Sequence, residues 1–185
     1  SRIYCVDPWN DVYVKGRKEF SGLDPCFKEQ YSRFLFNVRN HKDKVTVLRG
    51  SSNEIVPSLE EEFDLVYIDG DHHPGQVYQD AVMALRVTKS GGIILFDDRL
   101  LDIGGISPKD GMYRFTSEFS GCVEIRMENA QLAAQVKNIW ANPRYVRTKY
   151  VAEKPPILLD SWGPSDAICS HLYQGRTWEA EVALF

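Results

Sequence analysis

Acidic side chains follow three short apolar segments of this 185-residue sequence, each at the point where the segment ends. These are residues 3–6 before Asp7, residues 65–68 before Asp69, and residues 93–96 before Asp97 and Asp98. Neighbouring parallel strands lie about 4.8 Å apart, so carboxylates at the ends of two neighbours can share one ion. Carboxylates held together repel one another, which raises their pKa values unless a cation lies between them. An all-oxygen site of this kind suits Mg²⁺, Mn²⁺ or Ca²⁺ better than zinc.

The same aspartates have a simpler interpretation, because aspartate is common after strands, where it caps helices and turns. For any one of these aspartates considered alone, capping is the favoured interpretation. Taken together at several strand ends, they favour a shared site, since gathered carboxylates repel one another.

The apolar segments alternate with amphipathic stretches, which predicts a parallel sheet covered by helices on both faces. Continuous apolar runs predict buried strands at residues 3–6, 45–48, 65–68 and 93–96. Apolar residues at helical spacing predict helices over residues 27–38, 55–59 and 77–85. Gly91-Gly92 predicts a turn before the last of these strands. In such sheets ligands bind beyond the carboxyl ends of the strands, where the aspartates lie.

The remainder of the chain has weaker patterns. Residues 112–119 predict a helix, and residues 122–127 a strand, whereas residues 130–136 fit either a strand or a helix. We expect one α/β domain over residues 1–140, followed by an extension over residues 141–185 with no assignable structure.

Composition limits the class of partner. The 22 Lys and Arg against 26 Asp and Glu give a net charge of −4, which disfavours a nucleic-acid binder that relies on attraction to phosphate. The basic residues Arg144, Arg147, Lys149 and Lys154 are expected to form a solvated face. No apolar run approaches the ~18 residues that span a membrane. The 4 cysteines form no Cys-x-x-Cys pair and so give no zinc signal. Four cysteines in 185 residues are not disulfide-dense, which predicts reduced thiols and a cytoplasmic protein.

Three segments together resemble the class I S-adenosylmethionine-dependent methyltransferases. They are VTVLRGSSNEIVPSL at residues 45–59, FDLVYIDGDH at residues 63–72 and GGIILFDD at residues 91–98. The nearest branches are the cation-dependent O-methyltransferases, of the catechol and caffeoyl-CoA type and of the sugar type. The resemblance covers residues 3–98, extends more loosely over residues 99–137 and does not cover residues 141–185. It implies a Rossmann-like, mostly parallel sheet with helices on both faces.

The resemblance implies a set of contacts to the methyl donor. Asp7 would accept hydrogen bonds from the ribose hydroxyls, since a carboxylate offers two acceptors to two donors. Trp9 would pack near the adenine, or it is an ordinary core or surface aromatic. Gly50, Ser52 and Asn53 would meet the adenine edge, and they could equally cap the helix that follows.

The resemblance also implies a cation site and a base. Asp69, Asp97 and Asp98 fall on the positions that hold Mg²⁺ in the family, and Asp69 is counted among the donor contacts as well. Asp71 matches the general base of the sugar branch, and His72 falls where the catechol branch has a catalytic lysine. Both remain candidate bases, with Asp71 preferred because its surroundings follow the sugar pattern.

The chain departs from the family at its first strand. In the family that strand is central and carries a glycine-rich turn around the methionine end of the donor, and nothing before Ser1 supplies it. We consider three explanations. The chain is a fragment of a longer protein, residues 156–167 fill the place by circular permutation, or the donor site has been lost.

The expected function is therefore methyl transfer from S-adenosylmethionine to a hydroxyl of a small molecule, such as a sugar or a catechol-like diol, assisted by a divalent cation. The acceptor would meet the loops at residues 10–24 and 100–111. A homo-oligomer or membership of a longer chain is compatible with the sequence. The alternative is an inactive methyltransferase fold that serves binding or assembly.

Overall fold

The structure is a computed structural model that describes residues 2–9, 29–60, 62–137 and 182–184, and the account that follows is confined to them. The four predicted strands are confirmed as β1 (Ile3–Asp7), β2 (Val45–Arg49), β3 (Phe63–Ile68) and β4 (Thr88–Phe96). Residues 130–136 adopt the strand alternative. β5 (Val123–Glu128) and β6 (Leu132–Val136) pair antiparallel as a hairpin.

The predicted helices are present with shifted ends. They are α2 (Gln30–Val38), α3 (Ser52–Ile55), α4 (Pro74–Val87) and α5 (Pro108–Glu118), with short 3-10 turns η2 (Arg39–His41) and η3 (Val56–Ser58). The helix predicted at 55–59 begins earlier, and Pro57 falls in the η3 turn, where its missing N–H costs nothing. None of the helices in these segments is long and apolar enough to cross a membrane.

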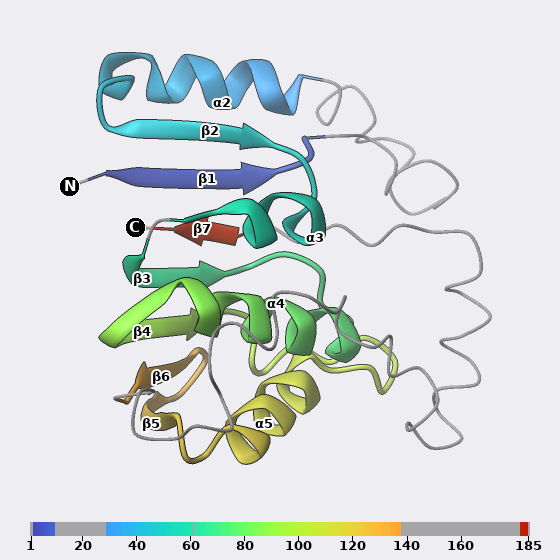
Figure 1. Ribbon diagram of the computed structural model, residues 1–185. Helices are drawn as coiled ribbons and strands as arrows, with labels where there is room; N and C mark the ends of the chain where they lie inside the picture. The colour runs from blue at the N-terminus through green and yellow to red at the C-terminus, as the bar shows by residue number, and fades with distance from the viewer. Residues whose placement is uncertain (1, 10–28, 61, 138–181, 185) are drawn as a thin grey trace.

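The sheet has the order β2-β1-β7-β3-β4-β6-β5 and is mostly parallel (Figure 1). The pairs β1–β2 and β3–β4 are parallel, and β6 lies antiparallel between β4 and β5. The strands β1 to β5 therefore all point the same way. Their carboxyl ends meet at one edge of the sheet, which is the edge where the aspartates lie.

The central place between β1 and β3 is taken by β7 (Val182–Leu184). Its backbone pairs antiparallel with β1 on one side and with β3 on the other. This pairing satisfies backbone groups of both neighbours that an empty place would leave without partners. Residues 156–167, the permutation candidate, lie outside the described residues, as do the basic residues of the 144–154 region.

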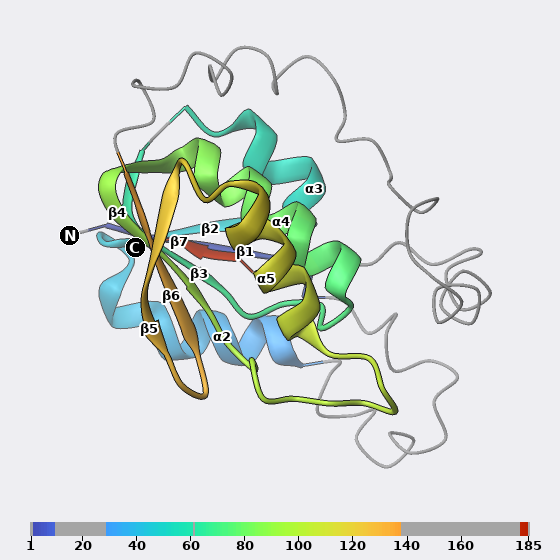
Figure 2. The ribbon, with the colours of Figure 1, turned by 90° about the horizontal axis from the view of Figure 1, so that it is seen from below.

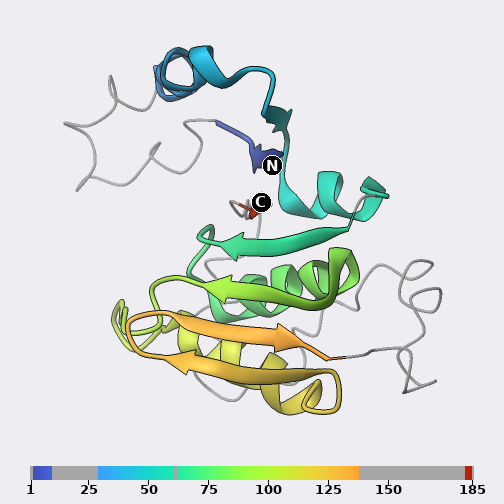
Figure 3. The same cartoon turned by 90° about the vertical axis from the view of Figure 1, so that its left-hand side faces the viewer.

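Helices cover both faces of the sheet, as predicted. α2 lies on one face, and α3, α4 and α5 lie on the other (Figure 2). The chain crosses the sheet in one direction from β1 to β2, and in the opposite direction from β2 to β3 and from β3 to β4. Because such crossovers are right-handed, α2 falls on one face and α3 and α4 on the other. The α2 layer lies at the β2 end of the sheet, and the β5–β6 hairpin forms the other end (Figure 3).

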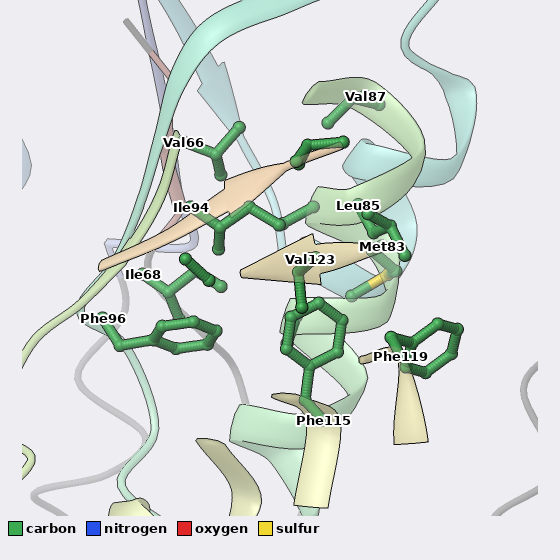
Figure 4. Close-up of a cluster of buried hydrophobic side chains, with 14 of the residues drawn as sticks. Val66, Ile68, Met83, Leu85, Val87, Ile94, Phe96, Phe115, Phe119 and Val123 are labelled. Carbon is green, nitrogen blue, oxygen red and sulfur yellow. The ribbon is translucent and has the colours of Figure 1, made fainter. Parts of the chain in front are cut away.

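The core lies between the sheet and the pair α4 and α5 (Figure 4). Alternate residues of β3 and β4 point into it, and Val66, Ile94 and Phe96 are fully buried there. Phe115 of α5 contacts both Phe96 and Phe119, with ring centroids 6.0 and 5.2 Å apart. This packing fixes the position of β3 and β4, and with them the acidic edge.

The glycine pair before the fourth strand does not form the predicted turn, and that prediction is wrong. Gly91 and Gly92 lie inside β4, where the pairing with β3 skips residues. Gly91 has a φ of 85°, which a residue with a side chain rarely adopts. The glycines thus allow an irregularity within one long strand.

Helices α4 and α5 approach closely at Gly111. A Cβ at this position would lie 2.2 Å from the Pro74 carbonyl oxygen, so Gly111→Ala must push the helices apart. We expect a loss of about 1–3 kcal/mol of unfolding free energy, as for overpacked cores, although alanine is the better helix former. Urea denaturation measures it.

Gly75→Ala in α4 is the matched control. Its Cβ would meet only the His73 ring, at 3.3 Å from Nδ1, and no backbone atom of another element. We expect it to be neutral, or to stabilise by up to ~1 kcal/mol. Equal effects of the two substitutions would contradict the close approach at Gly111.

Candidate active site at the carboxyl edge of the sheet

The register of β3 and β4 brings their acidic ends together. Ile68 pairs with Phe96, and the backbone N–H of Asp97 donates to the Ile68 carbonyl at 3.0 Å. Asp69 and Asp97 therefore leave the sheet side by side, on the face opposite the α4–α5 core. The prediction that these strand ends are neighbours is confirmed.

Asp69, His72 and Asp98 form the group with the spacing of a metal site. One ligand atom from each lies within 4.8 Å of the others, and all three side chains are partly buried. His72 Nε2 lies within hydrogen-bond distance of Asp98 Oδ2, at 2.7 Å. Two carboxylates and an imidazole are a donor set that a divalent cation can accept.

Asp97 is placed differently from its predicted partners. One of its carboxylate oxygens accepts a short hydrogen bond from the Tyr67 hydroxyl. The other accepts from Gln131 Nε2 at 3.1 Å and from the Asp98 backbone N–H at 2.9 Å. Both oxygens are engaged within the protein, so Asp97 contributes to the site through these hydrogen bonds, beside the Asp69–His72–Asp98 group.

The pKa values of Asp69 and Asp97 shift in opposite directions. Burial, together with the charges of Asp97 and Asp98, raises the pKa of Asp69. The hydrogen bond from Tyr67 lowers the pKa of Asp97. A uniform rise was expected from repulsion alone, and for Asp97 that expectation is wrong because a neutral donor stabilises its ionised form.

The turn between β5 and β6 holds the residues on either side of Asp98. Gln131 binds Asp97, as described. The Arg99 backbone N–H donates to the Ala130 carbonyl at 3.0 Å, and the Arg99 guanidinium donates to the Asn129 carbonyl. The same guanidinium also donates to the Tyr113 hydroxyl at 2.9 Å. The β4 tip is thus fixed from both sides.

Asp98 itself has a left-handed backbone, with a φ of 55°. Aspartate and asparagine enter this region more readily than other residues with a side chain. The conformation turns the Asp98 carboxylate toward His72 and Asp69, whereas the preceding carboxylate of Asp97 faces Tyr67.

Asp7 is the last residue of β1, and Trp9 follows it at the same edge of the sheet. Asp7 Oδ1 accepts a short hydrogen bond from the Trp9 backbone N–H. The Trp9 ring is 7% exposed and packs on Tyr31 and Phe34 of α2, with centroids 5.2 and 4.7 Å away. Trp9 is therefore a core aromatic of the α2 layer. A contact with adenine stays a prediction for it, as does the ribose contact for Asp7.

The segment predicted to meet adenine begins α3. Ser51 is the N-cap, and its N–H and hydroxyl donate to the Glu54 carboxylate at 3.3 and 3.0 Å. The Ser52 side chain is fully buried and donates to Asp80 Oδ1 at 2.7 Å. Asn53 is exposed and Gly50 is partly exposed, so these two residues can still reach a ligand at this edge.

The two candidate bases differ in access. Asp71 Oδ1 accepts from the His73 backbone N–H at 2.7 Å, and Asp71 Oδ2 is shielded from solvent. His73 caps α4 by accepting from the Gly75 N–H at 3.2 Å. The His72 side chain is 39% exposed beside Asp98. His72 is the more open of the two.

Sequence reasoning missed Tyr67 and Gln131 as parts of this site. Tyr67 lies in an apolar run, where its ring fits the strand pattern and its hydroxyl carries no separate signal. Its spacing of two residues from Asp69 could have indicated a shared face of β3. Gln131 comes 34 residues after Asp97, and no local pattern connects them.

The comparisons with known proteins agree with this fold. The family described as "Methyltransferase domain" matches residues 1–99. This match spans more than half of the 185 residues, so the chain belongs to that family. The resemblance to class I S-adenosylmethionine-dependent methyltransferases is thereby confirmed.

Two relatives are described as O-methyltransferases. O-methyltransferase hkm8 of Aspergillus hancockii is 30% identical over 69 residues, which are 37% of this chain and 27% of that protein. The structure of TomG from Streptomyces achromogenes, an O-methyltransferase of tomaymycin synthesis in complex with SAM, has a TM-score of 0.51 at 17% identity. That comparison covers 75% of this chain and 63% of TomG, and supports the fold. The chain thus matches less than two thirds of the length of either protein.

Tyr67→Phe tests the electrostatics of the acidic edge. Removing the hydroxyl removes the hydrogen bond that stabilises ionised Asp97, so we expect the pKa of Asp97 to rise. Carbon-detected NMR titration of the carboxyl groups measures this pKa. Tyr78→Phe is the control, because the Tyr78 hydroxyl donates to Glu118 on the far side of α4. An unchanged Asp97 pKa in Tyr67→Phe would exclude the hydrogen bond.

Proposed function

We propose that this chain is the catalytic region of an S-adenosylmethionine-dependent O-methyltransferase that acts on a small-molecule hydroxyl with the help of a divalent cation. The proposal rests mainly on one observation. Asp69, His72 and Asp98 gather within 4.8 Å at the carboxyl edge of a methyltransferase-family sheet. An inactive fold has no need to keep like charges together, because they repel.

Asp69 and Asp98 are the proposed cation ligands. They are the carboxylates of the group, and hard divalent cations prefer oxygen. Asp97 supports this site through Tyr67 and Gln131, and it lies close enough to raise the pKa of Asp69. A bound Mg²⁺ would lower the pKa of two neighbouring substrate hydroxyls, which favours a sugar diol or a catechol as acceptor.

His72 is the proposed proton acceptor. If its Nε2–H donates to Asp98, Nδ1 keeps a lone pair for the acceptor hydroxyl. The acceptor oxygen then forms a bond to the donor methyl carbon as the sulfur–carbon bond breaks, and the proton goes to the imidazole. The products are the methyl ether and S-adenosylhomocysteine. Asp71, with one oxygen bonded to His73 and the other shielded, would orient this loop.

The donor would lie along the same edge, from Asp7 to the start of α3. Asp7 offers a carboxylate for the ribose, and Gly50 and Asn53 offer backbone and amide groups for the adenine. The expected acceptor loop at residues 100–111 exposes Leu100 and Ile103, at 67% and 55%, directly after the acidic tip of β4. An acceptor with an apolar ring would fit beside them.

Asp98→Asn tests the cation site. The substitution keeps a residue that tolerates the left-handed backbone and removes one charged ligand. We expect Mg²⁺ affinity, measured by calorimetry, to fall by at least about tenfold, since even outer-shell changes at metal sites cost that much. Asp64→Asn is the matched control, because Asp64 is an exposed carboxylate paired with Lys89. Equal Mg²⁺ binding in both variants would reject the site.

His72→Asn and Asp71→Asn, compared directly, test the base. With catechol and a methyl glycoside as acceptors, we expect His72→Asn to lower kcat by roughly 10²–10⁴-fold, the usual contribution of a positioned base. Affinity for S-adenosylhomocysteine should stay unchanged. Asp71→Asn should lower kcat less. Loss of Mg²⁺ affinity in His72→Asn would make the imidazole a ligand, and the reverse order of kcat would assign the base to Asp71.

A further inference from the structure

A carboxyl group with no role in the proposed reaction is buried between α3 and α4. Asp80 is 1% exposed. Its Oδ1 accepts hydrogen bonds from the Ser52 hydroxyl at 2.7 Å and from Gln76 Nε2 at 3.0 Å. Its Oδ2 is buried and has no hydrogen-bond partner among the described residues. Such a group is costly to bury, so its retention calls for a function.

The surroundings of Asp80 favour its neutral form. Burial raises the pKa of Asp80 to about 8, against the opposing hydrogen bonds from Ser52 and Gln76. Of the ionisable groups in the described chain, Asp71 is the one whose charge acts on it, and that charge also raises the pKa. The side chains that hydrogen-bond to it, Ser52 from α3 and Gln76 from α4, are uncharged. Near neutral pH the group is therefore mainly a protonated acid.

The hydrogen bonds continue from Asp80 to the edge of the sheet. Gln76, which is 3% exposed, forms a side-chain amide pair with Asn53. Asn53 Nδ2 donates to Gln76 Oε1 at 3.3 Å, and Gln76 Nε2 faces Asn53 Oδ1 at 3.5 Å. Asn53 is exposed at the start of α3. A buried carboxyl is thus connected through one side chain to an amide at the candidate donor site.

We propose that Asp80 is a positioning residue for methyl-donor binding: through Ser52 and Gln76 it holds the first turn of α3 against α4 and orients the Asn53 amide. This inference rests on the proposed function, which places the adenine of the donor beside Asn53. The neutral acid accepts both hydrogen bonds without burying a charge. Ionised Asp80 would be a buried anion near Asp71, and the contact between α3 and α4 would open to hydrate it.

The test is the pH dependence of donor-product affinity. S-adenosylhomocysteine is titrated into the full chain by calorimetry between pH 6.5 and pH 9.5. For the unmodified protein we expect affinity to fall as pH rises through the pKa of Asp80, at a rate approaching ~10-fold per pH unit above it. Asp80→Asn keeps the acceptor oxygen and cannot ionise. Its affinity should match that of the unmodified protein at low pH and stay constant as pH rises.

Thermal unfolding of the same two proteins, followed from about pH 4 upwards, separates a positioning role from a purely structural one. The pKa of Asp80 is higher in the folded state than in the unfolded state. The free energy of unfolding therefore falls as pH rises from about 4 to about 8, and it stays at the lower value above that. The melting temperature of Asp80→Asn should therefore exceed that of the unmodified protein by a margin that grows over this range. A purely structural Asp80 would show this margin while affinity remained independent of pH.

Gln76→Leu provides a second variant that leaves Asp80 in place. It breaks the connection to Asn53 and should weaken S-adenosylhomocysteine binding without changing Mg²⁺ binding. Gln79→Leu is its control on the same helix, since Gln79 makes none of these hydrogen bonds. Parallel pH profiles for the unmodified protein and Asp80→Asn, or equal binding by the two leucine variants, would overturn the inference. Absence of binding by the unmodified protein at every pH would overturn the proposed function, and this inference with it.

Discussion

Repulsion between carboxylates at one edge of the sheet is the constraint on which the rest of this structure depends. Asp69, Asp97 and Asp98 would push the ends of β3 and β4 apart if nothing compensated their charge. Two of the three are compensated within the protein: Asp97 accepts from Tyr67 and Gln131, and Asp98 contacts His72. The raised pKa of Asp69 reflects the burial and repulsion that remain.

The core supplies the rigidity that this arrangement needs. Strands β3 and β4 are held by the buried side chains of α4 and α5, and the β5–β6 turn binds the tip of β4 from outside. An acidic edge destabilises the fold locally, and a well-packed layer behind it compensates. The acidic edge and the left-handed Asp98 therefore adjoin the buried side chains of β3 and β4.

The strands and the acidic edge could be predicted because they depend on short-range patterns. Continuous apolar runs identify β1 to β4, and parallel topology alone requires their carboxyl ends to meet. The internal arrangement of the edge could not be predicted, because it depends on contacts over long sequence separations. Gln131 donates to Asp97 and the Ser52 hydroxyl donates to Asp80, and no local sequence pattern indicates either partner. The Gly91-Gly92 turn was also wrong, since glycine permits a bulge as readily as a turn.

The left-handed backbone at Asp98 restricts which amino acids this position can accept. Branched or large side chains would clash with their own carbonyl there, whereas aspartate, asparagine and glycine fit. Evolution can therefore adjust the charge at this point from minus one to zero without moving the chain. Under the proposed function, one such exchange would change the charge of the cation site, and with it the preferred ion, while the architecture stayed intact.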